Sequence, residues 1–133
     1  MASIHKDIPI NADSDRVWAA VRDFGAVHLL APGFVVDTRL EDGARIVTFA
    51  NGNVARELLV DCDEARRRLV YAVISERVKQ HSASVQIVAE GEQRCRMLWT
   101  TDVLPHALAA EIQIRMERGA IEMRQAIEAT ACG

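Results

Sequence analysis

The sequence lacks the residue patterns of several specialised protein classes. Its three cysteines, Cys62, Cys95 and Cys132, are odd in number and far apart, so we expect reduced thiols and neither a disulfide framework nor a zinc site. The four histidines do not have the spacing of metal ligands, and the sequence contains no phosphate-binding loop and no nucleophile–base motif. We therefore expect no metal and no cofactor.

Basic residues are scattered along the sequence and form almost no clusters. The only basic cluster, Arg66-Arg67-Arg68, is short and follows acidic residues, and the net charge of the chain is −3. A nucleic-acid partner requires a basic stripe, so we expect none. No apolar run approaches the roughly 20 residues of a membrane-spanning helix, and the N-terminal residues lack the apolar block of a signal peptide. These absences predict a cytoplasmic protein without a membrane span.

The composition is that of an ordinary globular domain. Of its 133 residues, 50% are hydrophobic and 26% are charged, and no repeat or linker marks a boundary, so we expect one domain over residues 1–133. The alternation of Ile4, Ile8 and Ile10 predicts a half-buried first strand. Two short helices should follow, one after the capping residues of Asn11–Asp15 and one from Ala26 to Leu30, which Pro32 ends.

Six further segments have the alternation and the turn residues of strands. They are FVVDTRLE, ARIVTFAN, VARELLVDCD, RRLVYAVIS, KQHSASVQIVAEG and QRCRMLWTTDVL. Their links, such as Asp42-Gly43 and Asn51-Gly52-Asn53, are too short for anything but antiparallel neighbours. The sequence therefore predicts a six-stranded meander, with the first strand added at its edge.

A helical pattern returns from His106 to Thr130. Its apolar stripe consists of Leu108, Ile112, Met116, Ala120, Met123 and Ile127. Glu111 and Arg115 are expected to be mainly in water, and Gly119 indicates tight packing or a bend. The predicted fold is α+β: a seven-stranded curved antiparallel sheet wrapped around a long C-terminal helix, with two short helices after the first strand and room for an apolar pocket between sheet and helix.

The triplet Asp23-Phe24-Gly25 matches the magnesium-binding motif of protein kinases. The kinase reading also needs a glycine-rich loop, a strand lysine and an HRD loop, and the sequence has none of them. We interpret the triplet as the end of the first helix, with Phe24 on its apolar face.

The stretches DSDRVWAAVRDFGAVHLLAPG, NGNVARELLVDCDEARRRLVYAVIS and CRMLWTTDV resemble the START/Bet v 1-like (SRPBCC) superfamily, and within it the bacterial polyketide cyclase/dehydrase-like branch. The resemblance covers about residues 3–129. It implies a helix-grip fold with a deep cavity between the sheet and the C-terminal helix. Members bind hydrophobic molecules such as lipids, quinones and polyketides, and some catalyse cyclisation or dehydration, so the fold alone does not fix the function.

The resemblance to plant hormone receptors of this superfamily places Glu57 and Tyr71 inside the cavity. Strand alternation and the helical stripe extend the set of cavity residues. The predicted ligand-binding residues are Glu57, Leu59, Leu69, Tyr71, Val73, His81, Ala83, Met97, Trp99, Thr101, Leu108, Ile112, Met116 and Met123. Glu57, Tyr71 and His81 are also the candidate acid–base groups.

Some positions have a second interpretation. Carboxylates are seldom fully buried, so Glu57 could instead pair with Arg45 or another neighbouring strand residue on the outer face, and His81 could be partly exposed. The receptor position that holds a lysine for a ligand carboxylate falls in Phe34-Val35-Val36 here, which disfavours an anionic ligand head group. By family analogy, the loops Ala50–Val54 and Ser75–Gln80 should flank the cavity entrance.

Three functions remain open. The first is a binding module for a small hydrophobic molecule. The second is an enzyme of the polyketide cyclase/dehydrase type, and the third is a homodimer or partner-binding domain with a vestigial cavity. Binding needs only shape and an apolar lining, whereas catalysis needs two polar groups within reach of one substrate. The sequence shows the first condition more clearly, so it favours binding.

Overall fold

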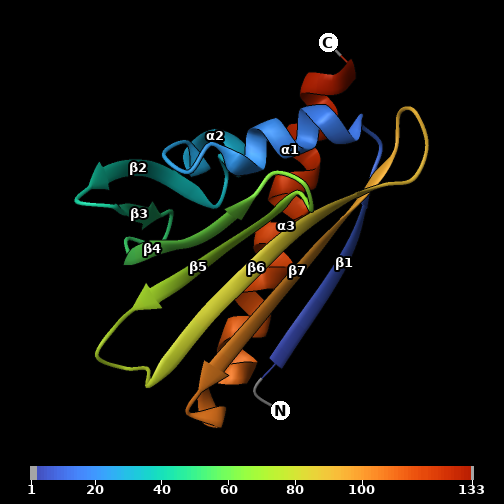
Figure 1. The fold of residues 1–133 in the computed structure, drawn as a ribbon. Coiled ribbons are helices and arrows are strands. Elements are labelled where there is room, and N and C mark those ends of the chain that lie inside the picture. The colour runs from blue at the N-terminus through green and yellow to red at the C-terminus, as the bar shows by residue number, and fades with distance from the viewer. Residues whose placement is uncertain (1–2, 133) are drawn as a thin grey trace.

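The computed structural model describes residues 3–132, with side chains from residue 3 to residue 130. The elements along the chain are β1 (Ser3–Ile10), α1 (Ser14–Arg22), α2 (Val27–Leu30), β2 (Val35–Glu41), β3 (Ala44–Phe49), β4 (Val54–Asp63), β5 (Arg68–Ile74), β6 (Gln80–Ala89), β7 (Cys95–Leu104), the 3₁₀ turn η1 (His106–Leu108) and α3 (Ala109–Cys132) (Figure 1). The last helix thus begins at Ala109, after a separate 3₁₀ turn.

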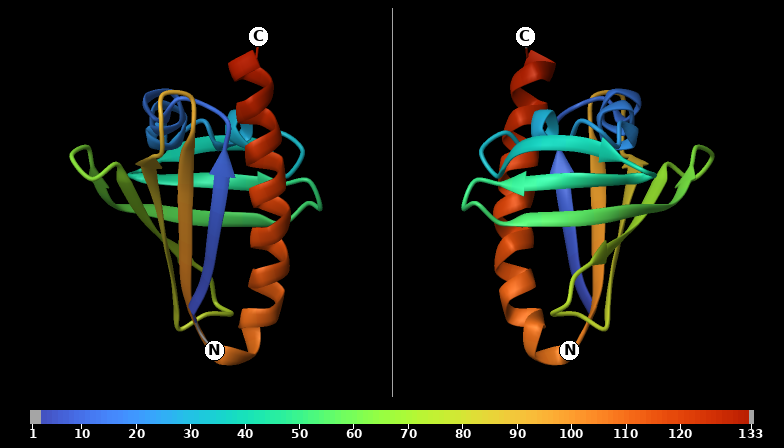
Figure 2. Two further views of the ribbon diagram at one scale, coloured as in Figure 1. Left: turned by 90° about the vertical axis from the view of Figure 1, so that its right-hand side faces the viewer. Right: turned by 90° about the vertical axis from the view of Figure 1, so that its left-hand side faces the viewer.

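All seven strands form one antiparallel sheet in the order β1-β7-β6-β5-β4-β3-β2. β2 to β7 are a meander, and β1 returns to pair with β7, where Ile4 lies opposite Thr101 and Ile8 opposite Met97. The sheet is strongly curved, because β2, β3 and β4 run across α3 whereas β1 and β7 run along it (Figure 2). The predicted helix-grip fold is confirmed.

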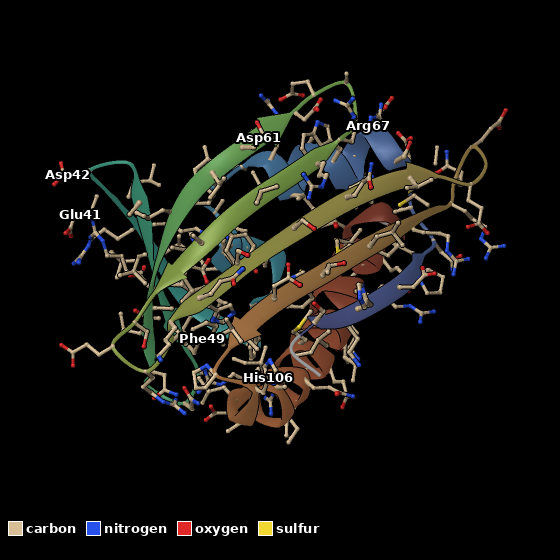
Figure 3. All side chains as sticks on the ribbon, turned by 60° about the horizontal axis from the view of Figure 1, so that its bottom comes forward. Glu41, Asp42, Phe49, Asp61, Arg67 and His106 are labelled. Atoms are coloured by element: carbon tan, nitrogen blue, oxygen red, sulfur yellow. The ribbon has the colours of Figure 1, made fainter. Side chains whose placement is uncertain are left out.

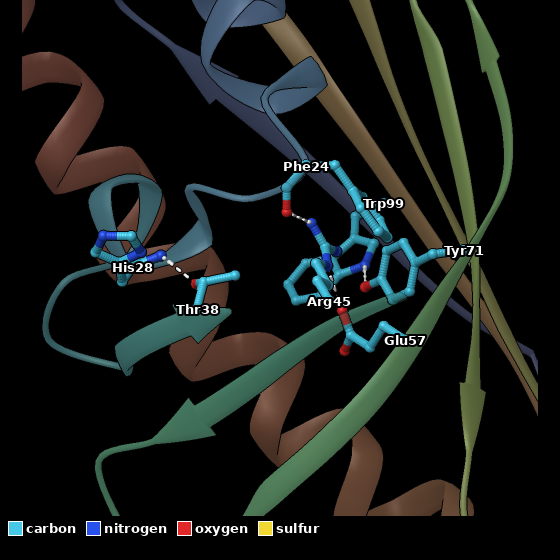
Figure 4. A network of polar contacts seen from close by, with 7 residues as sticks. All are labelled: Phe24, His28, Thr38, Arg45, Glu57, Tyr71 and Trp99. Carbon is cyan, nitrogen blue, oxygen red and sulfur yellow. Dashed lines mark hydrogen bonds and ion pairs between the residues drawn. The ribbon is translucent and has the colours of Figure 1, made fainter. Parts of the chain in front are cut away.

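The short helices cover one end of the curved sheet. The side chain of Asp13 accepts a hydrogen bond from the backbone N–H of Asp15 at 3.2 Å and so caps α1. The apolar face of α1 buries Val17, Trp18 and Val21. The next helix, α2, is tied to β2 by a hydrogen bond of 3.1 Å from the backbone N–H of His28 to Oγ1 of Thr38 (Figure 4).

α3 closes the inner face of the sheet. Its predicted stripe is buried at Ile112, Met116, Ala120, Met123 and Ile127. A Cβ atom on Gly119 would lie 3.1 Å from Cη2 of Trp99 and 3.3 Å from the ring of Phe34, so the expected tight packing at this glycine is confirmed.

The core has a large and a small part. The large cluster joins the inner face of the sheet to α1 and to the second half of α3, and the small cluster contains Ile4, Val103, Ile112 and Met116. Trp99 packs against both clusters. The outer face of β4 to β7 carries its own side chains away from α3, which lies behind the strands in Figure 3.

The structure bears on two expectations from the sequence, the state of the cysteines and the absence of a membrane span. Cys62 and Cys95 are free thiols, as expected, while the side chain of Cys132 lies outside the described part of the chain. Over residues 3–132, no helix combines the length and the apolar character that crossing a membrane would require.

Candidate ligand-binding site

A cavity of about 350 Å³ lies between the inner face of the sheet and α3. Its inner end is formed by buried side chains, among them Val21, Val47 and Met123. The opposite end, here called the mouth, is formed by Asn53, Val54, Ser75, Arg77, Glu111 and Arg115, of which the first four are exposed. This gradient of exposure shows that the cavity opens to solvent between the β3–β4 turn, the β5–β6 loop and the first turns of α3.

The structure brings eleven of the 14 predicted binding residues to the cavity wall. They are Glu57, Leu69, Tyr71, Val73, His81, Trp99, Thr101, Leu108, Ile112, Met116 and Met123. The two loops expected at the entrance also contribute wall residues, Asn53 and Val54 from one and Ser75, Arg77 and Val78 from the other. Binding of a ligand by these residues stays a prediction.

Leu59 was expected on the wall beside Glu57, and this expectation is wrong. Its side chain is 44% exposed and does not line the cavity. The register of β4 against β5 shifts between Leu59 and Asp61, which marks a β-bulge at this point. Leu59 is the last residue in register with β5 before the bulge, and a bulge bends the strand and increases its twist, so the alternation that begins at Glu57 fails where the bulge begins.

Ala83 and Met97 are also not wall residues, for a different reason. Both are buried in the large core cluster, where Met97 has no exposed surface. Ala83 lies between its strand partners Tyr71 and Thr101, whose larger side chains reach the cavity past it. Alternation assigned these residues to the correct face of the sheet, but it could not tell the depth of each side chain.

Three arginines line the wall that were not predicted there: Arg45, Arg77 and Arg115. Arg115 and Glu111 were expected in water, whereas both are half-buried at the mouth. A signal for Arg45 was present, because Arg45, Val47 and Phe49 alternate along β3 and all three line the cavity.

A buried ion pair forms the polar part of the inner wall (Figure 4). Arg45 and Glu57 are register partners on β3 and β4, and Nε of Arg45 donates to Oε1 of Glu57 at 2.7 Å. Nη1 of Arg45 also donates to the backbone oxygen of Phe24 at 3.3 Å. The guanidinium carbon lies 4.2 Å from the centre of the Phe24 ring and 4.8 Å from that of Tyr71, so cation–π contacts on both rings hold it in place.

Phe24 therefore has a defined part in the site. It comes directly after Asp23, the C-cap of α1, so the interpretation of Asp23-Phe24-Gly25 as a helix end agrees with the structure. Its ring and its carbonyl oxygen both contact Arg45.

Tyr71 and Glu57 offer opposite hydrogen-bonding capacity to the cavity. Oη of Tyr71 accepts a hydrogen bond from Nε1 of Trp99 at 3.3 Å, so its own O–H proton is available to a ligand. Burial raises the pKa of Tyr71, and the nearby charge of Glu57 raises it further. Only Oε1 of Glu57 has a hydrogen-bond donor among the described residues, which leaves Oε2 as an acceptor.

Burial is also the main influence on the pKa values of Glu57 and His81. It raises the pKa of Glu57, and the charge and hydrogen bond of Arg45 offset part of this effect. It lowers the pKa of His81, and the positive charge of Arg115 acts in the same direction.

His81 does not join the inner polar group. The residue of β6 that pairs with Tyr71 is Ala83, so His81 lies two positions further along the strand, about 7 Å away in the direction of the mouth. The structure thus brings Glu57 and Tyr71 together with Arg45, and it places the third candidate acid–base group apart from them.

Comparison with known proteins decides the family. The sequence profile of the family described as "Polyketide cyclase / dehydrase and lipid transport" matches residues 1–129. The chain belongs to this family. No curated protein matches the sequence.

Solved structures with the same fold are similar to this chain. Norcoclaurine synthase from Thalictrum flavum, in complex with dopamine and hydroxybenzaldehyde, is similar with a TM-score of 0.76 and 20% identity over 98% of this chain and 86% of that one. A START superfamily protein from Mycobacterium smegmatis has a TM-score of 0.75 and 12% identity over 97% and 96%. A protein from Thermobifida fusca has a TM-score of 0.77 and 25% identity over 96% and 91%.

These findings place the family within the START/Bet v 1-like (SRPBCC) superfamily, as the sequence predicted. Family and fold together support a ligand-binding domain in general terms. Among the side chains of residues 3–130, no group of three or more histidine, cysteine, aspartate or glutamate residues could hold a metal ion.

Proposed function

We propose that the protein binds a small hydrophobic molecule, such as a lipid, a polyketide or a quinone-like compound, in the cavity between the sheet and α3. The observation that carries this proposal is the cavity itself, about 350 Å³ in volume and walled mainly by apolar side chains. Sites for small molecules have volumes of about 300 to 1,000 Å³, so this volume suits a small ligand. Removal of apolar ligand surface from water supplies the driving force, about 25 cal/mol per Å².

The inner polar group gives this ligand a preferred orientation. Tyr71 offers a hydroxyl proton and Glu57 a carboxyl oxygen, while Arg45 is already engaged by Glu57 and by the carbonyl of Phe24. A neutral hydroxyl or carbonyl group on the ligand can satisfy these partners without adding a charge to a buried place. The buried end of the ligand should therefore be a neutral oxygen function.

Binding can be tested with N-phenyl-1-naphthylamine, a neutral apolar dye whose fluorescence rises on transfer out of water. We expect the protein to bind the dye and Val73→Phe to weaken binding, because Val73 lines the cavity and a larger side chain there reduces its volume. Val70→Phe is the matched control on the same strand, since Val70 faces the groove on the outer side of the sheet. Equal binding by both variants would contradict the proposal.

The identity of the ligand needs a second experiment. Native mass spectrometry of protein purified from its own host should show a mass above that of the 14.7 kDa chain. Dissociation of that species would release the ligand for identification.

A second candidate function is an enzyme of the polyketide cyclase/dehydrase type. The observation that favours it is the placement of a carboxyl group and a phenol, Glu57 and Tyr71, at one part of the wall. Glu57 could remove a proton from a carbon between two carbonyl groups, while Tyr71 hydrogen-bonds the oxygen on which the enolate charge develops. His81 lies closer to the mouth and would act only on a more distant part of the same substrate.

Turnover of a poly-β-keto mimic tests this candidate. If Glu57 is the base, Glu57→Gln should lower the rate by at least about 100-fold, since a positioned general base contributes on the order of 100- to 10,000-fold. Circular dichroism would show that the variant is folded. Equal rates for the variant and the parent protein would exclude this role for Glu57.

The third candidate, a dimeric interaction domain with a vestigial cavity, has less support. A void of this size is more than a vestige, because protein interiors leave few voids larger than a water molecule. The homodimer and the cytoplasmic location both remain predictions.

A further inference from the structure

The mouth of the cavity carries a second polar cluster, which the proposed function does not use. Nη2 of Arg77, in the β5–β6 loop, donates to Oε2 of Glu111 on α3 at 2.8 Å. Nη2 of Arg115 lies 3.6 Å from Oε1 of the same carboxylate. The two oxygens of the Glu111 carboxylate therefore face two different arginines. The same two arginines could bind the two oxygens of another carboxylate or of a phosphate.

Both arginines are held at the mouth by their surroundings. The backbone N–H of Arg77 donates to Oγ of Ser75 at 3.1 Å, and that of Lys79 donates to the carbonyl of Leu104 at 2.9 Å, which fixes the loop on either side. Between them, Val78 packs against the small core cluster. On α3, Glu111 and Arg115 are four residues apart and so share one face of the helix.

The mouth is positively charged within an acidic protein. Three arginines and two glutamates line the cavity. Arg45 and Glu57 neutralise one another at the inner end, so the excess positive charge lies at the mouth, whereas the whole chain has a net charge of −3. The effect of Arg115 on His81 is consistent with this local field, because it disfavours a second positive charge there.

The ion pairs of Glu111 with Arg77 and Arg115 are open to solvent. The side chains of Arg77, Glu111 and Arg115 are 58%, 41% and 34% exposed. Ion pairs with this much exposure contribute little to stability, because water competes for both partners. An anionic group on a ligand can therefore replace the Glu111 carboxylate at small cost.

We propose that the mouth is the head-group site for an amphipathic anion, with its apolar chain in the cavity and its carboxylate or phosphate between Arg77 and Arg115. This inference rests on the proposed function, which supplies the site for the chain. The absence of a lysine in residues 34–36 disfavoured an anionic ligand, but Arg77 and Arg115 provide the positive charge from elsewhere in the sequence.

The test compares three ligands with one chain length: octanol, octanoate and octyl phosphate, each displacing N-phenyl-1-naphthylamine. We expect the unchanged protein to bind octanoate or octyl phosphate at least about threefold more tightly than octanol, and added salt to reduce this preference. The anion with the greater affinity identifies the head-group chemistry.

Variants that change the charge of the mouth show which residues cause the preference for anions over octanol. Glu111→Gln should tighten binding of the anions by at least about threefold and leave octanol unchanged, because it removes the competing carboxylate. The double variant Arg77→Gln/Arg115→Gln should abolish the preference. Arg118→Gln is the control, since it removes the same charge from an exposed position on α3 that does not line the cavity.

The outcomes separate the two proposals. If octanol binds as tightly as both anions, or if the preference survives in the double variant, the head-group site is wrong and the cavity proposal stands. If neither the dye nor any of the three ligands binds, the proposed function fails, and the head-group site fails with it.

Discussion

Arg45 and Glu57 lie opposite one another on β3 and β4, with Nε of the arginine 2.7 Å from Oε1 of the glutamate. Their side chains are only 6% and 10% exposed. Neither charge could occupy this position alone, because an unpaired buried charge costs several kcal/mol. Pairing allows two charged side chains to be part of an otherwise apolar cavity wall. The effect of the pairing can be measured as a difference in the free energy of unfolding between single and double variants.

Removal of one partner should be costly, and removal of both should not. We expect Glu57→Ala to lower the free energy of unfolding by roughly 3 kcal/mol, because it leaves Arg45 buried without a counter-ion. The double variant Arg45→Met/Glu57→Leu should be far closer to the parent protein. Urea denaturation of the parent protein, of the single variants Arg45→Met and Glu57→Leu, and of the double variant gives the coupling energy. Additive effects of the two single changes would refute a stabilising pair.

His81 should make stability depend on pH. Burial and Arg115 hold the folded-state pKa of His81 below the ordinary 6.5, so the unfolded chain takes up a proton at a higher pH than the folded protein. The contribution of His81 is therefore fully present above pH 6.5, and it falls as the pH drops from 6.5 to the lowered folded pKa. Below that value, His81 causes no further change.

Urea midpoints measured between pH 5 and pH 8 check this dependence. Glu57 contributes with the opposite sign, because its raised folded pKa favours the folded state at low pH. Comparison with His81→Asn isolates the histidine, and His106→Asn changes an exposed histidine as a control. A pH profile that is the same in the parent and in His81→Asn would exclude the proposed burial effect.

The fold was predictable because its signals are local. Turn residues such as Asp42-Gly43 separate the strands, and links of that length permit only antiparallel neighbours. The strand order in the structure is the order that these links imply, with β1 added beside β7. The long helical stripe of α3 then had only one large apolar surface to cover, the inner face of the sheet.

The candidate site was less predictable, because it depends on register and depth. The bulge that begins at Leu59 leaves no clear mark in the alternating pattern, so the prediction extended the cavity wall from Glu57 to Leu59. Met97 is on the expected face but lies in the core, and depth depends on neighbours that are distant in sequence. The pairing of Arg45 with Glu57 was one interpretation of the sequence, but it was assigned to the outer face, whereas the structure places the pair on the cavity wall.

Leu59 and Leu69 provide a direct check of the corrected placement. They lie on neighbouring strands, but Leu59 is 44% exposed whereas Leu69 is 2% exposed and lines the cavity. We expect Leu69→Ala to lower the free energy of unfolding by about 2 to 5 kcal/mol, and Leu59→Ala by less than about 1 kcal/mol. Equal losses in urea denaturation would mean that Leu59 is buried after all.

Gly119 should be intolerant of a side chain, although it interrupts a helix. Valine has a better helix propensity than glycine, but a Cβ atom at this position would already lie 3.1 Å from the ring of Trp99. Overpacking of this kind costs about 1 to 3 kcal/mol, so Gly119→Val should destabilise the protein and alter the near-UV circular dichroism of tryptophan.

Arg118→Val places the same side chain at the adjacent, exposed position of α3 and isolates the packing effect. We expect it to change the free energy of unfolding by less than about 0.5 kcal/mol and to leave the tryptophan signal unaltered. If Gly119→Val were as stable as this control, Trp99 would have room to move into the cavity. The ring would then be an adjustable part of the wall, and dye binding by Gly119→Val would fall as the ring occupied the space.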